Sequence, residues 1–203
     1  MNPSSIPSIF FISDTKSALD IVPGLLQSGI KGIQLRDKNC SRLALYETSL
    51  YLREITLRHN ALFIVNDYPD LAAATDADGV HLGQNDMPVI EARKILHDRI
   101  IGISTHSIEQ AKSAFEAGAD YIGFGPVFVT STKDAGEPRG LAELKRVVGM
   151  MSIPVVAIGG INQFNVDSVA AAGCSSIAVI SALMGKDYEA DAARLMSAFS
   201  SRM

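Results

Sequence analysis

Eight short runs of apolar residues alternate with stretches of helical character along this chain, and this alternation constrains the fold more than any other feature. The runs are rich in isoleucine and valine and are bounded by glycine, aspartate or proline. Such runs are typical of parallel strands that are buried on both faces. We therefore predict eight strands, at residues 9–12, 32–35, 62–65, 79–82, 100–104, 121–124, 155–158 and 177–180.

The stretches between these runs carry the spacing of amphipathic helices. Residues 41–58 place a set of apolar side chains along one side, as expected of a helix that packs by that side: Leu43, Tyr46, Leu50, Ile55 and Leu57. Further helices are predicted at residues 87–96, 108–117 and 188–199, with Ser107 as the N-cap of the second of these. The segments 117–122 and 172–177 resemble one helix-to-strand turn used twice.

Eight strand–helix units in 203 residues predict a single domain, residues 1–203, folded as an α/β (β/α)₈ TIM barrel near the lower size limit of that fold. The alternative is a doubly wound open sheet. Such a sheet usually has about six strands, so it would not accommodate all eight strand–helix units.

Composition and charge exclude several classes of protein. Eighteen Lys and Arg residues against 22 Asp and Glu residues leave a net charge of −4, so no electrostatic footprint of a nucleic-acid partner is present. No apolar stretch approaches the roughly 20 residues of a membrane span, and no basic residue precedes the short apolar run at the N-terminus. Cys40 and Cys174 are expected to be reduced thiols. We expect a cytoplasmic protein with no nucleic-acid or membrane partner.

Polar residues gather directly after the predicted strands, where a TIM barrel carries its active site. They are Gln34, Arg36, Asp37 and Lys38 after the second strand, Asn66 and Asp67 after the third, Gln84, Asn85 and Asp86 after the fourth, Ser104, Thr105 and His106 after the fifth, and Thr130, Ser131, Thr132, Lys133 and Arg139 in the long loop after the sixth. The opposite rim of the barrel shows no comparable cluster, so we predict one polar site at the carboxyl ends of the strands.

Two pairs of charges in this set have a chemical interpretation. Arg36 and Lys38 share one side of an extended segment, and such a pair suits an anionic group such as phosphate. Asp67 and Asp86 end neighbouring strands, which brings their carboxylates within reach of one ion. Each aspartate alone could be a helix cap or a turn residue. The pair beside two cations predicts a Mg²⁺ ion, one per active site, held together with substrate phosphate.

A second anion site is predicted at the opposite side of the barrel mouth. Gly159 and Gly160 follow the seventh strand, and Ile180 and Ser181 end the eighth, which is where TIM barrels commonly bind phosphate. Glycine lets backbone N–H groups approach an oxyanion because no Cβ intervenes. Lys133 could form a Schiff base or act as a fixed charge, and the absence of desolvating neighbours favours the fixed charge. His81, inside a strand, is interpreted as a satisfied core or wall residue rather than a ligand.

The same rim segments resemble the thiamine phosphate synthase family along nearly the whole chain. The resemblance rests on residues 34–38, 66–67, 77–86, 102–106, 118–128, 130–133, 157–161 and 179–181. A Gly-Gly or Asn-Asp pair is unspecific alone, but the ordered set in register with eight strand ends is highly specific. Val129 departs from the family, which often has proline there, and residues 134–139 are only loosely patterned.

The resemblance implies a Mg²⁺-dependent transferase of thiamine biosynthesis. Members of the family condense 4-amino-2-methyl-5-(diphosphooxymethyl)pyrimidine with 4-methyl-5-(2-phosphooxyethyl)thiazole, or its carboxylated form, to give thiamine monophosphate and diphosphate. The reaction implied is dissociative, through a carbocation on the pyrimidine. The partners implied are these small-molecule substrates, and a homodimer is one assembly open to such a barrel.

The resemblance also implies roles for individual residues. Contacts with the pyrimidine diphosphate are implied for Gln34, Leu35, Arg36, Asp37, Lys38, Asn66, Ser104 and Lys133, of which Arg36, Lys38, Ser104 and Lys133 would be catalytic. Contacts with the thiazole phosphate are implied for Thr130, Ser131, Thr132, Gly160, Ile180 and Ser181. Asp67 and Asp86 would be the metal ligands. The length of loop 129–140 and its Gly136 and Gly140 suggest that it closes over the bound substrates.

Three other functions share parts of this pattern. A thiazole tautomerase has the same barrel and thiazole phosphate site, but it tends to carry a histidine base where Pro126 stands and lacks the Asn-Asp and Gln-x-Asp residues. A ligand-sensing barrel that regulates gene expression would be expected to lose Asp67, Asp86 or Lys133, and all three are present. A sugar-phosphate isomerase or aldolase would be distinguished by borohydride trapping at Lys133.

Overall fold

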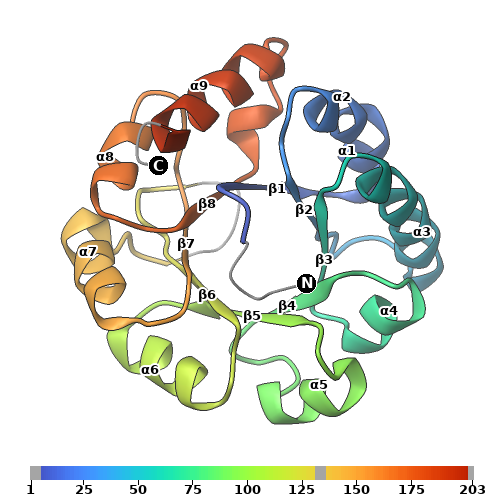
Figure 1. The fold of residues 1–203 in the computed structure, drawn as a ribbon, viewed down its shortest axis with the longest axis horizontal. Helices are drawn as coiled ribbons and strands as arrows, with labels where there is room; N and C mark the ends of the chain where they lie inside the picture. The colour runs from blue at the N-terminus through green and yellow to red at the C-terminus, as the bar shows by residue number, and fades with distance from the viewer. Residues whose placement is uncertain (1–5, 131–135, 201–203) are drawn as a thin grey trace.

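The computed structural model describes residues 6–130 and 136–200 as a closed barrel of eight parallel strands with helices around it (Figure 1). The strands are β1 (Ile9–Ser13), β2 (Gly32–Leu35), β3 (Leu62–Asn66), β4 (Gly79–Leu82), β5 (Ile100–Thr105), β6 (Tyr121–Phe124), β7 (Val155–Ile158) and β8 (Ser176–Val179). Each predicted strand is present, and its ends agree to within one residue. The pairing of β1 with β8, Phe10 opposite Ala178, closes the ring and excludes the open sheet. The predicted TIM barrel is confirmed.

Helices cover the outside of the barrel between successive strands (Figure 1). They are α1 (Thr15–Asp20), α2 (Val22–Gln27), α3 (Arg42–Arg58), α4 (Pro69–Ala74), α5 (Val89–Leu96), α6 (Ile108–Glu116), α7 (Gly140–Met150), α8 (Val166–Ala171), the 3₁₀ helix η1 (Ser181–Leu183) and α9 (Tyr188–Ser200). Ser107 caps α6, as predicted, because its hydroxyl accepts the Gln110 N–H at 3.2 Å. Among the described residues, none of these helices is long and apolar enough to cross a membrane.

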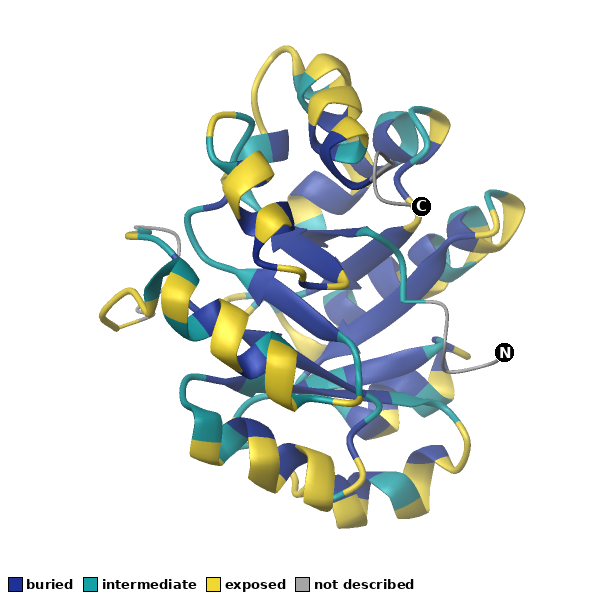
Figure 2. Ribbon diagram, turned by 60° about the vertical axis from the view of Figure 1, so that its left-hand side comes forward, coloured by how far each residue is buried: buried dark blue, intermediate teal, exposed yellow. Residues whose placement is uncertain are grey.

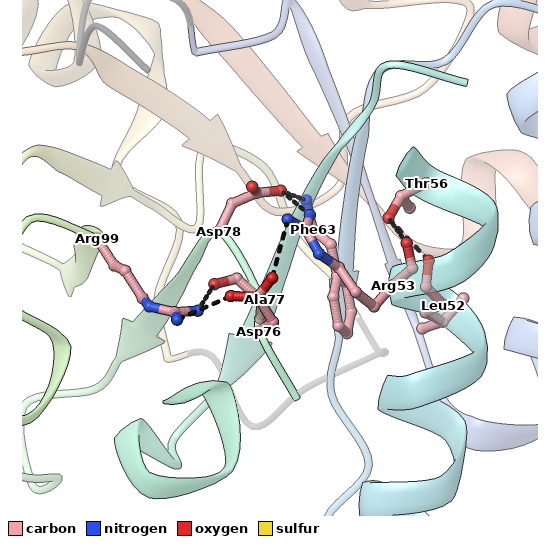
Figure 3. Close-up of polar contacts among 8 residues, drawn as sticks. All are labelled: Leu52, Arg53, Thr56, Phe63, Asp76, Ala77, Asp78 and Arg99. Atoms are coloured by element: carbon pink, nitrogen blue, oxygen red, sulfur yellow. Dashed lines mark hydrogen bonds and ion pairs between the residues drawn. The ribbon is translucent and has the colours of Figure 1, made fainter. Parts of the chain in front are cut away.

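Helix α3 packs by a different side from the one that the sequence pattern predicts. The apolar side chains of the expected face are exposed at Leu43, Tyr46, Leu50 and Leu57, while the buried ones are Leu45, Thr48, Ser49, Leu52 and Thr56. Thr56 is buried because its hydroxyl donates to the Leu52 carbonyl one turn earlier at 2.8 Å, as Figure 3 shows. A threonine bonded in this way packs as an apolar group, and this is why the prediction was wrong.

The core lies in two layers, one inside the barrel and one between barrel and helices. The inner layer contains Phe10, Ile12, Leu62, Ile64, Tyr121, Val156 and Ala178. The outer layer is larger and takes the alternate strand positions, such as Ile9 and Phe11. Figure 2 shows the strands buried and the outer faces of the helices exposed. Because side chains alternate along each strand, this division decides which residues point inward at the carboxyl ends.

Aspartates at the amino-terminal ends of β4 and β6 tie neighbouring elements together. The Asp78 carboxylate accepts the Phe63 N–H at 2.8 Å and the Arg53 guanidinium at 3.0 Å, and Figure 3 shows the three residues together. Asp120 does the same for the Ile101 N–H, at 2.8 Å, and Arg93, at 2.7 Å. These contacts lie at the end of the barrel opposite the carboxyl ends of the strands, where they serve stability.

The turn that ends at Asp120 recurs before β8, as the sequence pattern suggests. Gly118 and Gly173 hold the same place in the two turns, with φ of +87° and +89°. Both are left-handed, a conformation that glycine adopts without strain.

Asp78→Asn is expected to destabilise the fold by about 1.5–3 kcal/mol, because it weakens a charge-assisted bond to Arg53 in a site where both side chains are less than one-fifth exposed. Urea denaturation measures the change. Asp70→Asn is the control, since Asp70 and Arg42 are both at least half exposed and their ion pair is worth about 0–1 kcal/mol. Equal stability of the Asp78 variant and the wild type would contradict the assignment.

Candidate active site

A cavity of about 670 Å³ lies at the carboxyl ends of the strands. Its walls come from the ends of β2 to β8 and the loops that follow them. Both the place and the size suit a small-molecule site in a TIM barrel. The cavity lies at the rim where the polar residues were predicted to gather.

The two cations predicted for an anionic group both line the cavity. Arg36 and Lys38 follow β2 and share one side of the extended segment, as predicted. The Lys38 Nζ lies 3.7 Å from the Asp67 Oδ2, so the cationic part of the wall directly adjoins the acidic part. The β2 side of the cavity is therefore suited to a polyanion.

Leu35 and Asp37, which were predicted to contact the same ligand, do not line the cavity. Leu35 is buried in the outer core layer, because the strand alternation that turns Arg36 inward turns Leu35 toward the helices. The Asp37 carboxylate instead accepts the Thr15 hydroxyl at 2.6 Å and the Asn39 N–H at 2.9 Å. The bond from Thr15 is the main reason that the pKa of Asp37 is lowered. This carboxylate holds a loop rather than a ligand.

A pair of buried amides forms the floor beneath the two cations. Gln34 Nε2 donates to Asn66 Oδ1 at 2.8 Å, and both side chains are buried. Asn66 lines the main cavity, while Gln34 lies below it beside a void of about 20 Å³. This bond fixes the orientation of the Asn66 amide, so its N–H₂ group is held in one direction.

Asp67 and Asp86 stand side by side at the ends of neighbouring strands, as predicted. Asp67 has a φ of +66°, and its backbone N–H donates to the His81 carbonyl of β4 at 2.9 Å. Asp86 is held by the Gly83 N–H at 2.6 Å from its Oδ2. Burial raises the pKa of Asp67, and its contact with Asp86 raises this pKa further, against the opposing effect of Lys38. Two carboxylates this close repel each other unless a proton or a cation lies between them.

The donor chemistry of this carboxylate pair fits Mg²⁺. Both donors are carboxylate oxygens, which hard cations prefer. Among the described residues, no group of three or more His, Cys, Asp or Glu side chains could hold a metal by itself. Mg²⁺ is typically bound through one or two carboxylates and completes its octahedron with water and substrate phosphate. Asp67 and Asp86 would hold such an ion beside Lys38 and Arg36, where a polyanion would bind.

The β7 and β8 side of the cavity is built for close approach to the backbone. Gly160 has a φ of +66°, and a Cβ there would lie 2.6 Å from the Val129 carbonyl oxygen. Within the described residues, the backbone N–H groups of Gly160 and Ser181 have no hydrogen-bond acceptor. Free N–H groups beside a glycine turn and the start of η1 suit an oxyanion.

Four of the six residues predicted for the thiazole phosphate line this side of the cavity, namely Thr130, Gly160, Ile180 and Ser181. Ser131, Thr132 and Lys133 lie outside the described residues, and so does the central part, 131–135, of the loop expected to close.

Gln84, Asn85 and His106, predicted at this rim without a specific role, line the cavity. Gln110 also lines it and was not predicted. Gln84 Nε2 donates to the Ser104 carbonyl at 2.7 Å, and Gln110 Oε1 accepts the His106 N–H at 2.7 Å. The position of Gln84 and Asn85 directly after β4 is the signal that placed them at this rim. Gln110 lies within α6, and no pattern at the strand ends points to it.

His81 is a wall residue, as interpreted from the sequence. It is half-buried on β4, with Nδ1 2.9 Å from the Tyr121 hydroxyl and Nε2 2.8 Å from the Ser104 hydroxyl. Ser104, predicted to face the ligand, is half-buried and lines the cavity.

Comparison with known proteins gives a consistent picture. A family model described as thiamine monophosphate synthase matches residues 9–183. The thiamine-phosphate synthase of Archaeoglobus fulgidus is 46% identical over 191 residues, covering 92% of this chain and 90% of the relative. That of Chloroflexus aurantiacus is 43% identical over 188 residues, covering 92% and 87%.

Solved structures show the same likeness. Thiamine phosphate pyrophosphorylase from Pyrococcus furiosus matches with a TM-score of 0.88 and 40% identity over 96% of each chain. A 3-hexulose-6-phosphate synthase, at 16% identity and a TM-score of 0.74, shares the fold alone.

Proposed function

Since the chain belongs to the thiamine monophosphate synthase family, we propose that it is a transferase that makes thiamine monophosphate. It joins 4-amino-2-methyl-5-(diphosphooxymethyl)pyrimidine to 4-methyl-5-(2-phosphooxyethyl)thiazole and releases diphosphate; with the carboxylated form of the thiazole, the carboxyl group would also leave as CO₂. The observation that carries this proposal is a single cavity with two separate anion-binding sides. One side has Arg36, Lys38 and the two aspartates, and the other has the Gly160 turn and Ser181.

The pyrimidine diphosphate occupies the β2 to β5 side of the cavity. Arg36 and Lys38 pair with the diphosphate, and Asn66, fixed by Gln34, and Ser104 contact the substrate from below. Asp67 and Asp86 hold one Mg²⁺ ion, which when bound neutralises charge on the diphosphate oxygens. The thiazole phosphate takes the opposite side, where Gly160, Ser181 and Thr130 receive its oxygens.

The reaction on this site is dissociative. The bond between the pyrimidine methylene carbon and the diphosphate oxygen breaks, and its electron pair leaves with the diphosphate. The thiazole nitrogen then gives its lone pair to the methylene carbocation. This nitrogen carries no proton, so no general base is required. The protein instead holds the growing negative charge with Arg36, Lys38 and Lys133 and keeps the two reactants face to face.

Pro126 favours this reaction over that of the related tautomerase. It lines the cavity at the position where the tautomerase tends to have its histidine base. A proline has no proton to exchange, whereas Asn66, Asp67 and Asp86, which the tautomerase lacks, are all in the wall.

Diphosphate release in the presence of both substrates tests the proposal. We expect release that requires the thiazole phosphate and Mg²⁺ and stops with EDTA, and parallel assays with the carboxylated thiazole identify the preferred form. Borohydride should leave the activity intact, since Lys133 acts as a charge. Folded protein that binds thiazole phosphate but releases no diphosphate under any of these conditions would instead support the tautomerase.

A further inference from the structure

Three polar side chains form a chain from the barrel interior to the cavity. Tyr121 on β6, His81 on β4 and Ser104 on β5 come from three neighbouring strands. The Tyr121 hydroxyl is 2.9 Å from His81 Nδ1, and His81 Nε2 is 2.8 Å from the Ser104 hydroxyl. Tyr121 is 2% exposed, His81 and Ser104 are half-buried, and Ser104 lines the cavity. The chain thus links a buried phenol to the substrate site.

The backbone around this chain makes room for the two rings. A Cβ on Gly102 would lie 2.0 Å from Tyr121 Cζ, and one on Gly123 would lie 3.1 Å from His81 Cε1. The Tyr121 ring also stacks on Phe10 with a centroid separation of 6.0 Å. The ring positions are therefore tightly determined, so Tyr121 has little freedom to turn its hydroxyl to another acceptor.

Burial decides the direction of the bond between Tyr121 and His81. Within the described residues, His81 Nδ1 is the hydrogen-bond partner of the Tyr121 hydroxyl. If Nδ1 carried a proton, the phenol would accept it and leave its own proton buried without an acceptor. An unmet buried donor costs more than an oxygen lone pair left unused. The phenol therefore donates, and Nδ1 is the acceptor. Burial raises the pKa of Tyr121, which keeps the phenol protonated.

The direction of this first bond determines that of the second. A neutral imidazole with an unprotonated Nδ1 carries its proton on Nε2, which then donates to the Ser104 oxygen. The single proton of the serine hydroxyl is thereby left to point away from His81. We propose that His81, held in this tautomer by Tyr121, positions the Ser104 hydroxyl as a hydrogen-bond donor toward an acceptor atom of the bound substrate. The identity of that substrate rests on the proposed function, whereas the tautomer does not.

The tautomer is tested by NMR on the intact protein labelled with ¹⁵N-histidine and free of substrate. The His81 signals are identified by their loss in His81→Gln. We expect a protonated Nε2 and an unprotonated Nδ1 at neutral pH. The reverse tautomer, or an imidazolium ring, would overturn the proposal. This measurement needs no turnover, so it distinguishes failure of the proposal from failure of the proposed function.

Tyr121→Phe tests the positioning role, because it keeps the stacked ring and removes the donor. We expect the His81 tautomer to become mixed and kcat to fall about tenfold, with little change in KM for the thiazole phosphate. Tyr46→Phe, on the exposed side of α3, is the matched control and should change neither. A Tyr121→Phe protein with the wild-type tautomer and kcat would contradict the assignment.

A double variant separates positioning from structural support. If Tyr121 acts through Ser104, adding Tyr121→Phe to Ser104→Ala should lower kcat by less than about twofold beyond Ser104→Ala alone. Two effects that multiply would mean that Tyr121 supports the barrel independently of Ser104, and the proposal would then fail.

Discussion

Asp67→Asn is expected to lower kcat by about a hundredfold or more, because a metal ion on a leaving group contributes several kcal/mol of charge stabilisation in the transition state. Asparagine is the appropriate replacement, since it keeps the shape of the side chain and tolerates the left-handed φ of +66° at this position. Initial rates of diphosphate release at saturating Mg²⁺ measure the effect. Asp70→Asn, on the exposed surface of α4, is the control and should retain full activity.

The same variant should not lose stability, and this separates a site effect from unfolding. Burial and Asp86 raise the pKa of Asp67, so the folded protein holds the proton of this carboxyl more tightly than the unfolded chain does. The resulting stabilisation is present below the ordinary Asp pKa and is lost as the pH rises through the raised value. At neutral pH the ionised pair therefore disfavours the metal-free fold, and Asp67→Asn should raise its Tm.

Mg²⁺ completes the test of this pair. We expect Mg²⁺ to raise the Tm of the wild type, because it binds the folded protein alone, and to leave that of Asp67→Asn nearly unchanged. An Asp67→Asn protein with activity within threefold of the wild type would show that the carboxylate pair is structural. So would a variant that Mg²⁺ stabilises as much as it stabilises the wild type.

Arg36→Met is expected to lower kcat/KM for the pyrimidine diphosphate by about 10²–10³-fold, the usual cost of removing a preorganised donor to developing charge. Methionine keeps the length of the aliphatic stem, so packing at the end of β2 is largely preserved. Product inhibition by diphosphate should weaken as well, because the same guanidinium holds the product. KM for the thiazole phosphate should stay close to that of the wild type, since its site is on the other side of the cavity.

The neighbouring residue supplies the matched control. Asp37→Asn alters a carboxylate that bonds Thr15 and Asn39 outside the cavity. It should cost about 1 kcal/mol of stability, the scale of a weakened hydrogen bond, and change turnover less than twofold. If Asp37→Asn reduced kcat/KM as much as Arg36→Met, the assignment of these two side chains to opposite sides of the segment would be wrong.

The strands were the most predictable feature of this protein. A parallel strand covered on both faces is a continuous apolar run in the sequence, so runs such as 62–65 and 155–158 mark strands directly. The proximity of Asp67 and Asp86 was equally predictable, because consecutive strands of a barrel are neighbours and their carboxyl ends share one rim.

Side-chain direction was less predictable where a residue has two environments open to it. The apolar side of α3 turned outward, since Thr56 satisfies its hydroxyl within the helix and packs inward. The Asp37 carboxylate bonds Thr15 instead of lining the cavity. Thr15 is 22 positions away in the sequence and comes close only through the pairing of β1 with β2.

By itself the sequence determined the barrel, the rim at which the polar residues gather, and the residue types on the two sides of the cavity that we propose bind anions. These follow from hydrophobic periodicity and strand order, which are local properties of a chain. Only the tertiary structure decided which rim residues face the cavity and how Tyr121, His81 and Ser104 connect across three strands. Such contacts depend on angstrom-scale distances between separate strands, and no spacing along one strand contains them.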